Sequence, residues 1–407
     1  MIKQIAGGVT APKGYQATGG AVGIKDGIKD MAILVSDVPA VAVGAFTTNV
    51  VKATSVLRNM HIMDKKNTIK GIVINSGNAN ACTGAEGERA NQEMAETLAQ
   101  CLNVGEEQIL TASTGVIGAV FPIETVKKGI HTLVPSLEST QEKGHLAAEA
   151  IMTTDTYCKE IAVEVEVGGK TITIGAMAKG SGMIHPNMAT MLSFVTTDAA
   201  IKRELLDEML KESVQTSYNM VSVDGDTSTN DTVVVLANGL AGNAEITQKN
   251  EDYDIFKKAL DFVNTKLAKD LVRDGEGATK LIEVYVLGAK TKEDAKTMAK
   301  SVITSNLVKT AMFGADANWG RVLCAMGYSG VAFDTKKVDI VYHSAKGSIV
   351  LMEQGTPIVF DEEKASEILH EKEITVEIKI QEGTEEAVAW GCDLSYDYVK
   401  INGDYRS

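Results

Sequence analysis

Thr190 is placed in the sequence where it could carry out covalent chemistry. It stands between a loop that contains Gly180-Ser181-Gly182 and Pro186 and a run rich in apolar and β-branched residues, Met191 to Thr197. A hydroxyl at the first residue of a strand, directly after the small Ala189, is well placed to attack the carbonyl that precedes it. Breakage of that bond would make Thr190 a new N-terminus, whose α-amine, with a pKa of about 7.7 to 8.0, can act as a base near neutral pH. A threonine paired with its own amine is a known activated nucleophile.

A single threonine at the start of a strand is most often an ordinary strand residue, so the surrounding sequence must decide between the two interpretations. The segment K-G-S-G-M-I-H-P-N-M-A-T-M-L, followed by T-T-D, resembles the self-cleavage segment of the ornithine acetyltransferase family, also called glutamate N-acetyltransferases. Members of that family are cut between the alanine and the threonine of A-T-M-L. The resemblance extends over nearly the whole chain and implies cleavage between Ala189 and Thr190, giving fragments 1–189 and 190–407.

The resemblance also implies a reaction, a transfer that belongs to arginine biosynthesis. Thr190 would take the acetyl group of N2-acetylornithine, release ornithine, and pass the acetyl group from an acetyl-threonine to the α-amine of glutamate. Such a scheme predicts ping-pong kinetics. Acetyl-CoA as a second acetyl donor is left open, because family members that use it and members that do not share these motifs. No other cofactor and no metal is expected.

Further site residues are implied by position. The family pattern places the oxyanion donors at Thr114 and Gly115, where residues alone indicate a strand-ending turn. Lys179 would offer a cation to a substrate carboxylate, and the hydroxyl of Thr156 would bind either substrate. Glu276, which by itself would be a solvated loop carboxylate, is suited to a substrate ammonium group. The resemblance also brings the C-terminal tail back to the site with two substrate-binding residues, Asn402 and Ser407.

Three other kinds of site are excluded by spacing. The phosphate-loop pattern ends correctly at Gly169-Lys170-Thr171, but its first glycine position holds Glu164. The acidic loop 224–231 lacks the glycine and the glutamate of a calcium loop. The six histidines show no metal-binding spacing, and His185, close to Ser181, is more typical of a structural loop residue.

Composition and charge indicate a soluble cytoplasmic protein. The 407 residues are 44% hydrophobic and 23% charged, with a formal net charge of −14, which argues against a nucleic-acid or anionic-membrane surface. The N-terminus lacks the apolar core of a signal peptide, and no run is long enough for a membrane helix. The odd number of scattered cysteines indicates reduced thiols, at Cys82, Cys101, Cys158, Cys324 and Cys392.

Strand and helix patterns alternate in antiparallel-looking pairs, which favours a layered α/β fold. Residues 161–174 alternate around a glycine turn and predict a hairpin that leads directly into residues 175–182. The resemblance sharpens this to an αββα sandwich similar to N-terminal-nucleophile hydrolases over 1–287, and a smaller C-terminal α/β domain over 288–407. Both fragments would share the sandwich core, and the family suggests a heterotetramer of two copies of each fragment.

Two alternatives remain open. An amidohydrolase or aminopeptidase with the same N-terminal nucleophile would pass acyl groups to water rather than to glutamate. A ligand-binding protein without enzymatic activity would have no use for cleavage, and its chain would stay intact at 43.3 kDa.

Overall fold

The computed structural model describes residues 1–185 and 191–404, which form two compact units. Unit 1 contains residues 1–180, 191–219 and 227–267, and unit 2 contains residues 181–185, 220–226 and 268–404. Each unit has its own sheet, and each is described below by itself.

The sheet of unit 1 has nine strands among the described residues, in the order β1-β6-β7-β8-β10-β3-β4-β5, with β2 paired to β3. The strands are β1 (Lys3–Ile5), β2 (Tyr15–Gly20), β3 (Met31–Phe46), β4 (Ile69–Asn78), β5 (Ile109–Val116), β6 (Lys159–Val167), β7 (Lys170–Lys179), β8 (Leu192–Thr197) and β10 (Thr232–Ala237). The predicted hairpin is confirmed, since β6 and β7 pair antiparallel with Val167 opposite Lys170.

Strand β3 joins two halves of this sheet, because its start pairs with β2 and β4 while its end pairs with β10. The sequence predicts two strands here, over 32–36 and 40–47, and the structure has one strand with an irregular register between Val35 and Ala40. Alternate residues of its first half face opposite sides. Ala32 and Leu34 join the core between the sheet halves, while Met31, Ile33 and Val35 face the outer helices.

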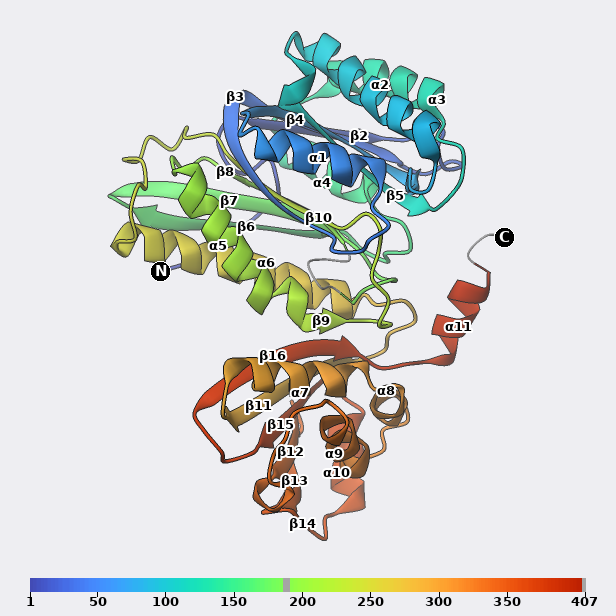
Figure 1. Ribbon diagram of the computed structural model, residues 1–407, viewed down its shortest axis with the longest axis vertical. Helices are drawn as coiled ribbons and strands as arrows, with labels where there is room; N and C mark the ends of the chain where they lie inside the picture. Colours follow the sequence, from blue (N-terminus) through green and yellow to red (C-terminus); the bar gives the residue numbers. More distant parts are fainter. Residues whose placement is uncertain (186–190, 405–407) are drawn as a thin grey trace. The chain divides into compact units, whose positions relative to one another are not determined.

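Helices cover the outer sides of the two sheet halves in unit 1, and others pack against the core between the halves. The helices are α1 (Thr54–Asp64), α2 (Gly84–Leu102), α3 (Ile123–Leu133), α4 (Gln141–Ala150), α5 (Arg203–Thr216) and the first part of α6 (Glu251–Arg273). Figure 1 shows α2 and α3 above β2 to β5 and α5 and α6 below β6 to β8. Apolar side chains of α2 and α3 pack in one core with β3, β4 and β5. This layering confirms the predicted αββα sandwich.

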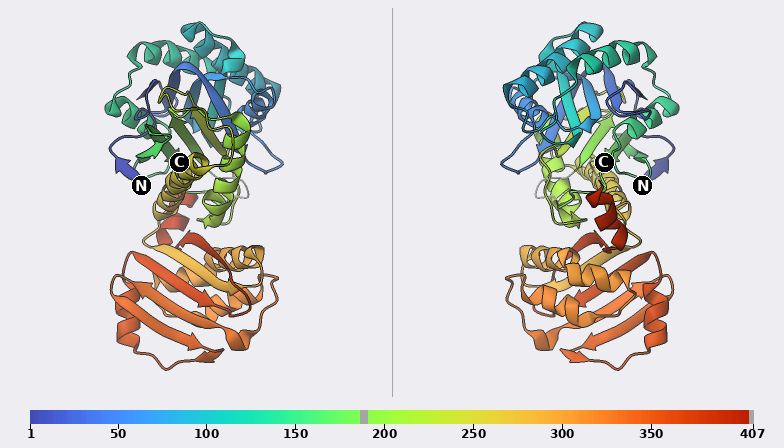
Figure 2. Two further views of the ribbon diagram at one scale, coloured as in Figure 1. Left: turned by 90° about the vertical axis from the view of Figure 1, so that its left-hand side faces the viewer. Right: turned by 90° about the vertical axis from the view of Figure 1, so that its right-hand side faces the viewer.

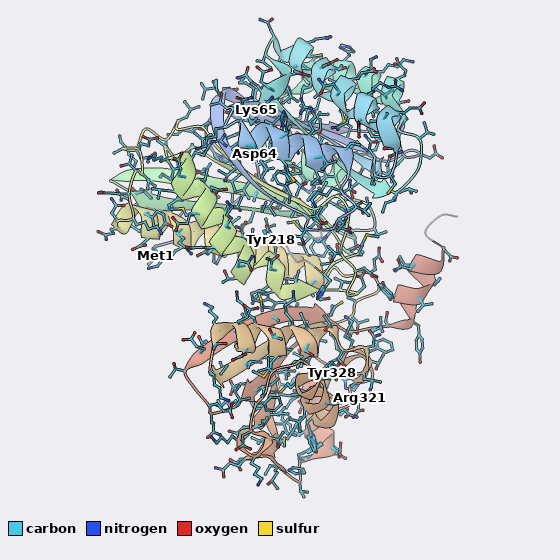
Figure 3. The ribbon with its side chains drawn as sticks, in the orientation of Figure 1. Met1, Asp64, Lys65, Tyr218, Arg321 and Tyr328 are labelled. Carbon is cyan, nitrogen blue, oxygen red and sulfur yellow. The ribbon has the colours of Figure 1, made fainter. Side chains whose placement is uncertain are left out.

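A buried polar network fixes β8, the strand that begins two positions after Thr190 in the sequence. The hydroxyl of Tyr218, labelled in Figure 3, lies 3.0 Å from Ser193 Oγ on β8 and donates to Asn264 Oδ1 on α6 at 3.4 Å. Asn264 Nδ2 in turn donates to Ser213 Oγ on α5 at 2.9 Å. Because these groups are buried, each hydrogen bond avoids the cost of an unpaired polar atom.

Unit 2 contains a seven-stranded sheet among its described residues, in the order β14-β13-β12-β15-β11-β16-β9. Its strands are β9 (Val221–Ser222), β11 (Leu281–Ala289), β12 (Asp339–Ser344), β13 (Gly347–Glu353), β14 (Thr356–Pro357), β15 (Glu373–Lys379) and β16 (Glu385–Cys392). Its helices are α7 (Lys292–Thr304), α8 (Asn306–Phe313), α9 (Trp319–Gly327), α10 (Glu362–Leu369) and α11 (Tyr396–Gly403). The left view of Figure 2 shows the strands side by side with helices behind them.

Two predicted boundaries differ from the structure of unit 2. The border expected at 287/288 falls inside β11, and the compact unit already includes residues from 268 onward. The single helix expected over 294–307 is two helices, because Ser305 ends α7 and caps α8 by accepting a hydrogen bond from the backbone N–H of Val308. None of the helices in the described part of the chain is long and apolar enough to cross a membrane.

Candidate active site

The predicted site residues fall into three groups. Ala189, Thr190 and Ser407 lie outside the described residues. Unit 1 contains Thr114, Gly115, Thr156 and Lys179, and unit 2 contains Glu276 and Asn402.

Lys179 and Thr114 come together in unit 1. Lys179 is the last residue of β7, and its buried Nζ donates to Thr153 Oγ1 at 2.8 Å and to Thr114 Oγ1 at 3.3 Å. Lys179 is also the register partner of Leu192, the first residue of β8. The lysine and the oxyanion threonine that the sequence assigns separately are therefore direct neighbours, next to the strand that follows Thr190 in the chain.

Gly115 lies where two backbones approach closely. It is opposite Gly77 in the parallel pairing of β4 and β5, and its φ of +130° is one that residues with a side chain rarely adopt. A Cβ atom on Gly115 would come within 2.3 Å of the carbonyl carbon of Gly77. Only glycine fits here without a shift of the backbone. The geometry thus explains the residue type, while the oxyanion role of Thr114 and Gly115 stays a prediction.

Asp155 organises the surroundings of Lys179, although the sequence does not single it out. Its Oδ1 accepts hydrogen bonds from Lys159 Nζ and from the backbone N–H of Gly180, both at 2.7 Å. Its Oδ2 accepts from the backbone N–H of Thr153 at 3.0 Å. The same carboxylate therefore holds the backbone of Gly180, which follows Lys179, and the backbone of Thr153, whose hydroxyl binds the Lys179 ammonium. Its place inside T-T-D-T, beside a predicted binding threonine, is the only signal that could have found it.

The charge of Asp155 is stabilised by the two lysines. Burial by itself raises the pKa of this carboxyl, but the positive charges of Lys179 and Lys159, together with the hydrogen bonds from Lys159 and Gly180, lower it to about 2. Asp155 is consequently ionised throughout the neutral range. Thr156, the next residue, is exposed.

Glu276 and Asn402 come together in unit 2. Asn402 Nδ2, on α11, donates to Glu276 Oε2 at 2.7 Å, and the backbone N–H of Glu276 donates to Ser181 O at 2.8 Å. A Cβ atom on Gly182 would lie 2.3 Å from the carboxyl carbon of Glu276, so glycine leaves room for this carboxylate. Glu276 is only 8% exposed, so it is not the solvated loop residue that sequence statistics favour.

Asp224 holds the segment that follows Ser181-Gly182. Its two carboxylate oxygens accept from the backbone N–H groups of Met183 and Ile184, at 2.6 and 2.9 Å. The pKa of Asp224 is raised above its usual value, mainly because the carboxyl group is buried. Burial also raises the pKa of Tyr398 on α11, and the negative charges of Asp224 and Glu276 add to that shift. The sequence gives the loop from Asp224 no role, and the structure makes it a support for residues 183–184.

His185 contacts Ser222, and this agrees with the structural role expected from the sequence. Its Nδ1 lies 3.1 Å from Ser222 Oγ. Burial, together with the charge of Lys300, lowers the pKa of His185 to about 4, so its ring is neutral near pH 7. Across residues 1–185 and 191–404, no three or more histidine, cysteine, aspartate or glutamate side chains gather into a possible metal site.

The layering of unit 1 defines the chain as an α/β protein built on an αββα sandwich. The chain belongs to the ArgJ family, whose model matches residues 16–407. It is 53% identical over 401 residues to an arginine biosynthesis bifunctional protein ArgJ from Caldanaerobacter subterraneus, covering 98% of this chain and 99% of that protein. A protein of the same name from Thermotoga neapolitana is 49% identical over 397 residues, covering 97% of this chain and 99% of that protein.

A solved relative covers part of the chain. The crystal structure of arginine biosynthesis bifunctional protein argJ from Bacillus halodurans matches with 47% identity and a TM-score of 0.51. The match covers 53% of this chain and 100% of the solved chain. The solved polypeptide is therefore about half as long as this one.

Proposed function

We propose that this protein transfers the acetyl group of N2-acetylornithine to glutamate through an acetyl-threonine at Thr190. The Thr190 hydroxyl oxygen attacks the acetyl carbonyl carbon, while the α-amine of Thr190 takes the hydroxyl proton and passes it to the departing nitrogen of ornithine. The α-amine of glutamate then attacks the ester carbon, and the Thr190 oxygen leaves and regains a proton. The products are ornithine and N-acetylglutamate.

The Lys179–Thr114 contact is the observation that carries this proposal. In this contact the Lys179 ammonium, which would bind a substrate carboxylate, donates to the hydroxyl of Thr114, the first residue of the predicted oxyanion pair. The register of Lys179 with Leu192 ties both to the strand that starts two positions after Thr190. The lysine cation on β7 and the threonine on β5 are thus in contact, and β7 pairs with β8, the strand that follows Thr190 in the sequence.

Oxyanion stabilisation is assigned to Thr114 and Gly115. In enzymes of known mechanism, each donor aimed at the developing negative charge lowers the activation free energy by roughly 3 to 4 kcal/mol. The close backbone packing at Gly115 supports this assignment, because a donor that is already held in place does not have to reorganise during the reaction.

Substrate recognition is divided by charge. Lys179 binds the α-carboxylate, and the Thr156 hydroxyl supplies a further hydrogen bond. Glu276, oriented by Asn402, binds the side-chain ammonium of the ornithine substrate, since a carboxylate that is hydrogen-bonded and largely buried makes a strong charge-assisted pair. Ser407 completes the set from the C-terminal tail.

Self-cleavage between Ala189 and Thr190 exposes the catalytic amine. Residues 190–407 make up slightly more than half of the chain, which agrees with the share of this chain that the solved Bacillus halodurans polypeptide covers. We propose that fragments 1–189 and 190–407 stay associated and that the working protein contains two copies of each. Light scattering on the purified protein measures that stoichiometry.

The test of the transferase proposal compares two fates of the acetyl group. With N-acetylornithine and glutamate, formation of N-acetylglutamate should exceed release of acetate, with ping-pong kinetics. Dominant hydrolysis would contradict the transferase reaction and favour an amidohydrolase. A parallel assay with glutamate and acetyl-CoA, without N-acetylornithine, decides whether acetyl-CoA is a donor.

A further inference from the structure

Lys25 lies in a loop that a single buried carboxylate holds in shape. Asp30, which is fully buried, accepts hydrogen bonds from four consecutive backbone N–H groups, those of residues 22 to 25, at 2.6 to 3.1 Å. Because four amides converge on one side chain, the backbone at Lys25 is fixed. The direction in which its side chain leaves the loop is therefore set by the fold of unit 1.

The Lys25 ammonium lies at the same turn as the Lys179 ammonium. Lys25 Nζ donates to the carbonyl oxygen of Met152 at 2.9 Å, and Lys179 Nζ donates to Thr153 Oγ1 at 2.8 Å. Met152 and Thr153 are consecutive residues, so two cations are attached to neighbouring points of one short segment.

The aliphatic part of the Lys25 side chain also lies against β4, the strand that pairs with the end of β5 where Thr114 and Gly115 lie. A Cβ atom on Gly77 would come within 2.7 Å of Lys25 Cγ, so the lysine covers the backbone at Gly77. Gly77 is in turn the register partner of Gly115 on β5. Lys25 thus binds the residue next to the Lys179 partner Thr153 and also lies against Gly77, the neighbour of Gly115.

The positive charge of Lys25 has no ion-pair partner within 4.0 Å among the residues that the structure describes. The backbone oxygen of Met152 is the only hydrogen-bond acceptor that it contacts in that part of the chain, although an ammonium has three protons to donate. The lysine is half-buried, and burial lowers its pKa; the nearby charge of Lys179 lowers it further, while Asp30 and Asp155 raise it. A bound anion would satisfy the remaining donors and offset the repulsion between the two lysines.

We propose that Lys25 binds substrate directly and, with Lys179, forms a two-lysine site for the α-carboxylate that both substrates carry. This inference rests on the proposed function. The α-carboxylate is attached to the carbon that bears the reacting nitrogen, so it must lie close to Thr114 and Gly115 during the transfer. It is also the one anionic group that ornithine and glutamate share, because their side chains carry opposite charges.

The test uses Lys25→Gln, which removes the charge and keeps an N–H group able to donate to Met152 O. Both kcat/KM for N-acetylornithine and kcat/KM for glutamate should fall by about tenfold or more, as expected for a lost charge-assisted hydrogen bond. Lys29→Gln is the matched control, since Lys29 is a partly exposed lysine of the same loop region that pairs with Glu149. It should leave both values within about twofold.

Each alternative outcome has a separate meaning. Unchanged kinetics in Lys25→Gln would overturn the role of Lys25, whereas a loss confined to glutamate would overturn its assignment to the α-carboxylate. Lys25→Arg keeps the charge and should recover most of the activity. Equal losses in the Gln and Arg variants with lowered unfolding temperatures would assign Lys25 a purely structural role. Absence of acetyl transfer in the unmodified protein would instead contradict the proposed function.

Discussion

At the scale of single residues, Asp155 links the two buried lysines of unit 1 to the backbone around the candidate site. It forms an ion pair with Lys159 at 2.7 Å in which both side chains are fully buried, and it accepts from the N–H of Gly180. Breaking such a pair leaves a charge that has neither water nor a partner, which typically costs about 3 to 5 kcal/mol. Stability and site geometry therefore depend on the same carboxylate.

Asp155→Asn should lower the unfolding temperature at pH 7, and the difference from the unmodified protein should depend on pH. The pKa of Asp155 is about 2 in the folded protein and 3.8 ordinarily. Its ionised form hence contributes stability above about pH 4, roughly 2 kcal/mol by linkage, and this contribution is lost as the pH falls through about 2. Calorimetry from pH 7 downward checks the trend. A difference that stays constant down to pH 2 would contradict it.

Gly115→Ala should reduce kcat/KM by roughly a hundredfold or more, because the added methyl group displaces the backbone that carries the predicted oxyanion donors. Gly118→Ala is a suitable control. Gly118 also has a positive φ, +77°, but a Cβ atom there would meet nothing within 4 Å. Steady-state kinetics on both variants separate the effect of the steric clash with Gly77 from the effect of placing alanine at a positive φ. Similar losses in the two would remove the argument for a positioned donor at Gly115.

Sequence predicted the residue types of the site better than their contacts. The family pattern assigns Lys179 and Thr114 separately, but their hydrogen bond joins positions 65 residues apart, which no local pattern records. No local pattern singles out Asp155 either, since its role depends on Lys179 and on Gly180, which is 25 residues further along the chain. Motif resemblance identifies which groups are present, whereas the fold decides which of them meet.

At the scale of elements, the sheet of unit 1 interleaves the two predicted fragments. Strands β8 and β10, which follow Thr190 in the sequence, lie between β7 and β3, which precede it. Both are fully buried along their length. Separation of the fragments would expose a row of unpaired backbone groups on each side together with the apolar core, and both exposures are costly.

Fragments 1–189 and 190–407 should therefore remain in one particle after cleavage. An affinity tag on the C-terminal fragment should recover both fragments in equal amounts, and size-exclusion chromatography should give one peak without denaturant. Thr190→Ala, expected to remain a single chain, provides the reference elution volume. Separate peaks for the processed fragments under native conditions would show that the strand interleaving does not hold them together.

The sequence predicts elements in which apolar and polar residues alternate clearly, but it does not predict helix boundaries that depend on a capping side chain. The β6–β7 hairpin has side chains that alternate between faces, and the residue pattern predicts it directly. The break between α7 and α8 depends on Ser305 accepting a backbone N–H, and the apolar spacing continues through it. The sequence predicts two strands in place of β3 because Asp37 and Pro39 interrupt the apolar pattern, whereas the structure has one strand whose pairing with β4 resumes at Ala40 after an irregular register.

At the scale of the whole molecule, the residues assigned to the reaction are spread over both units. Thr114, Gly115, Thr156 and Lys179 belong to unit 1, and Glu276 and Asn402 belong to unit 2. The chain passes from unit 1 to unit 2 directly after Gly180, one residue beyond Lys179. The relatives match over nearly the whole length of the chain, so the family assignment applies to both units together.

The central claim is that Thr190 carries the acetyl group between the two substrates. The most direct measurement is intact-mass spectrometry of the processed protein after exposure to N-acetylornithine in the absence of glutamate. Fragment 190–407 should gain the mass of one acetyl group, located on Thr190 by peptide mapping, and should lose it when glutamate is added. Transfer of the acetyl group to glutamate while fragment 190–407 never gains that mass, or acetylation at a residue other than Thr190, would contradict this account.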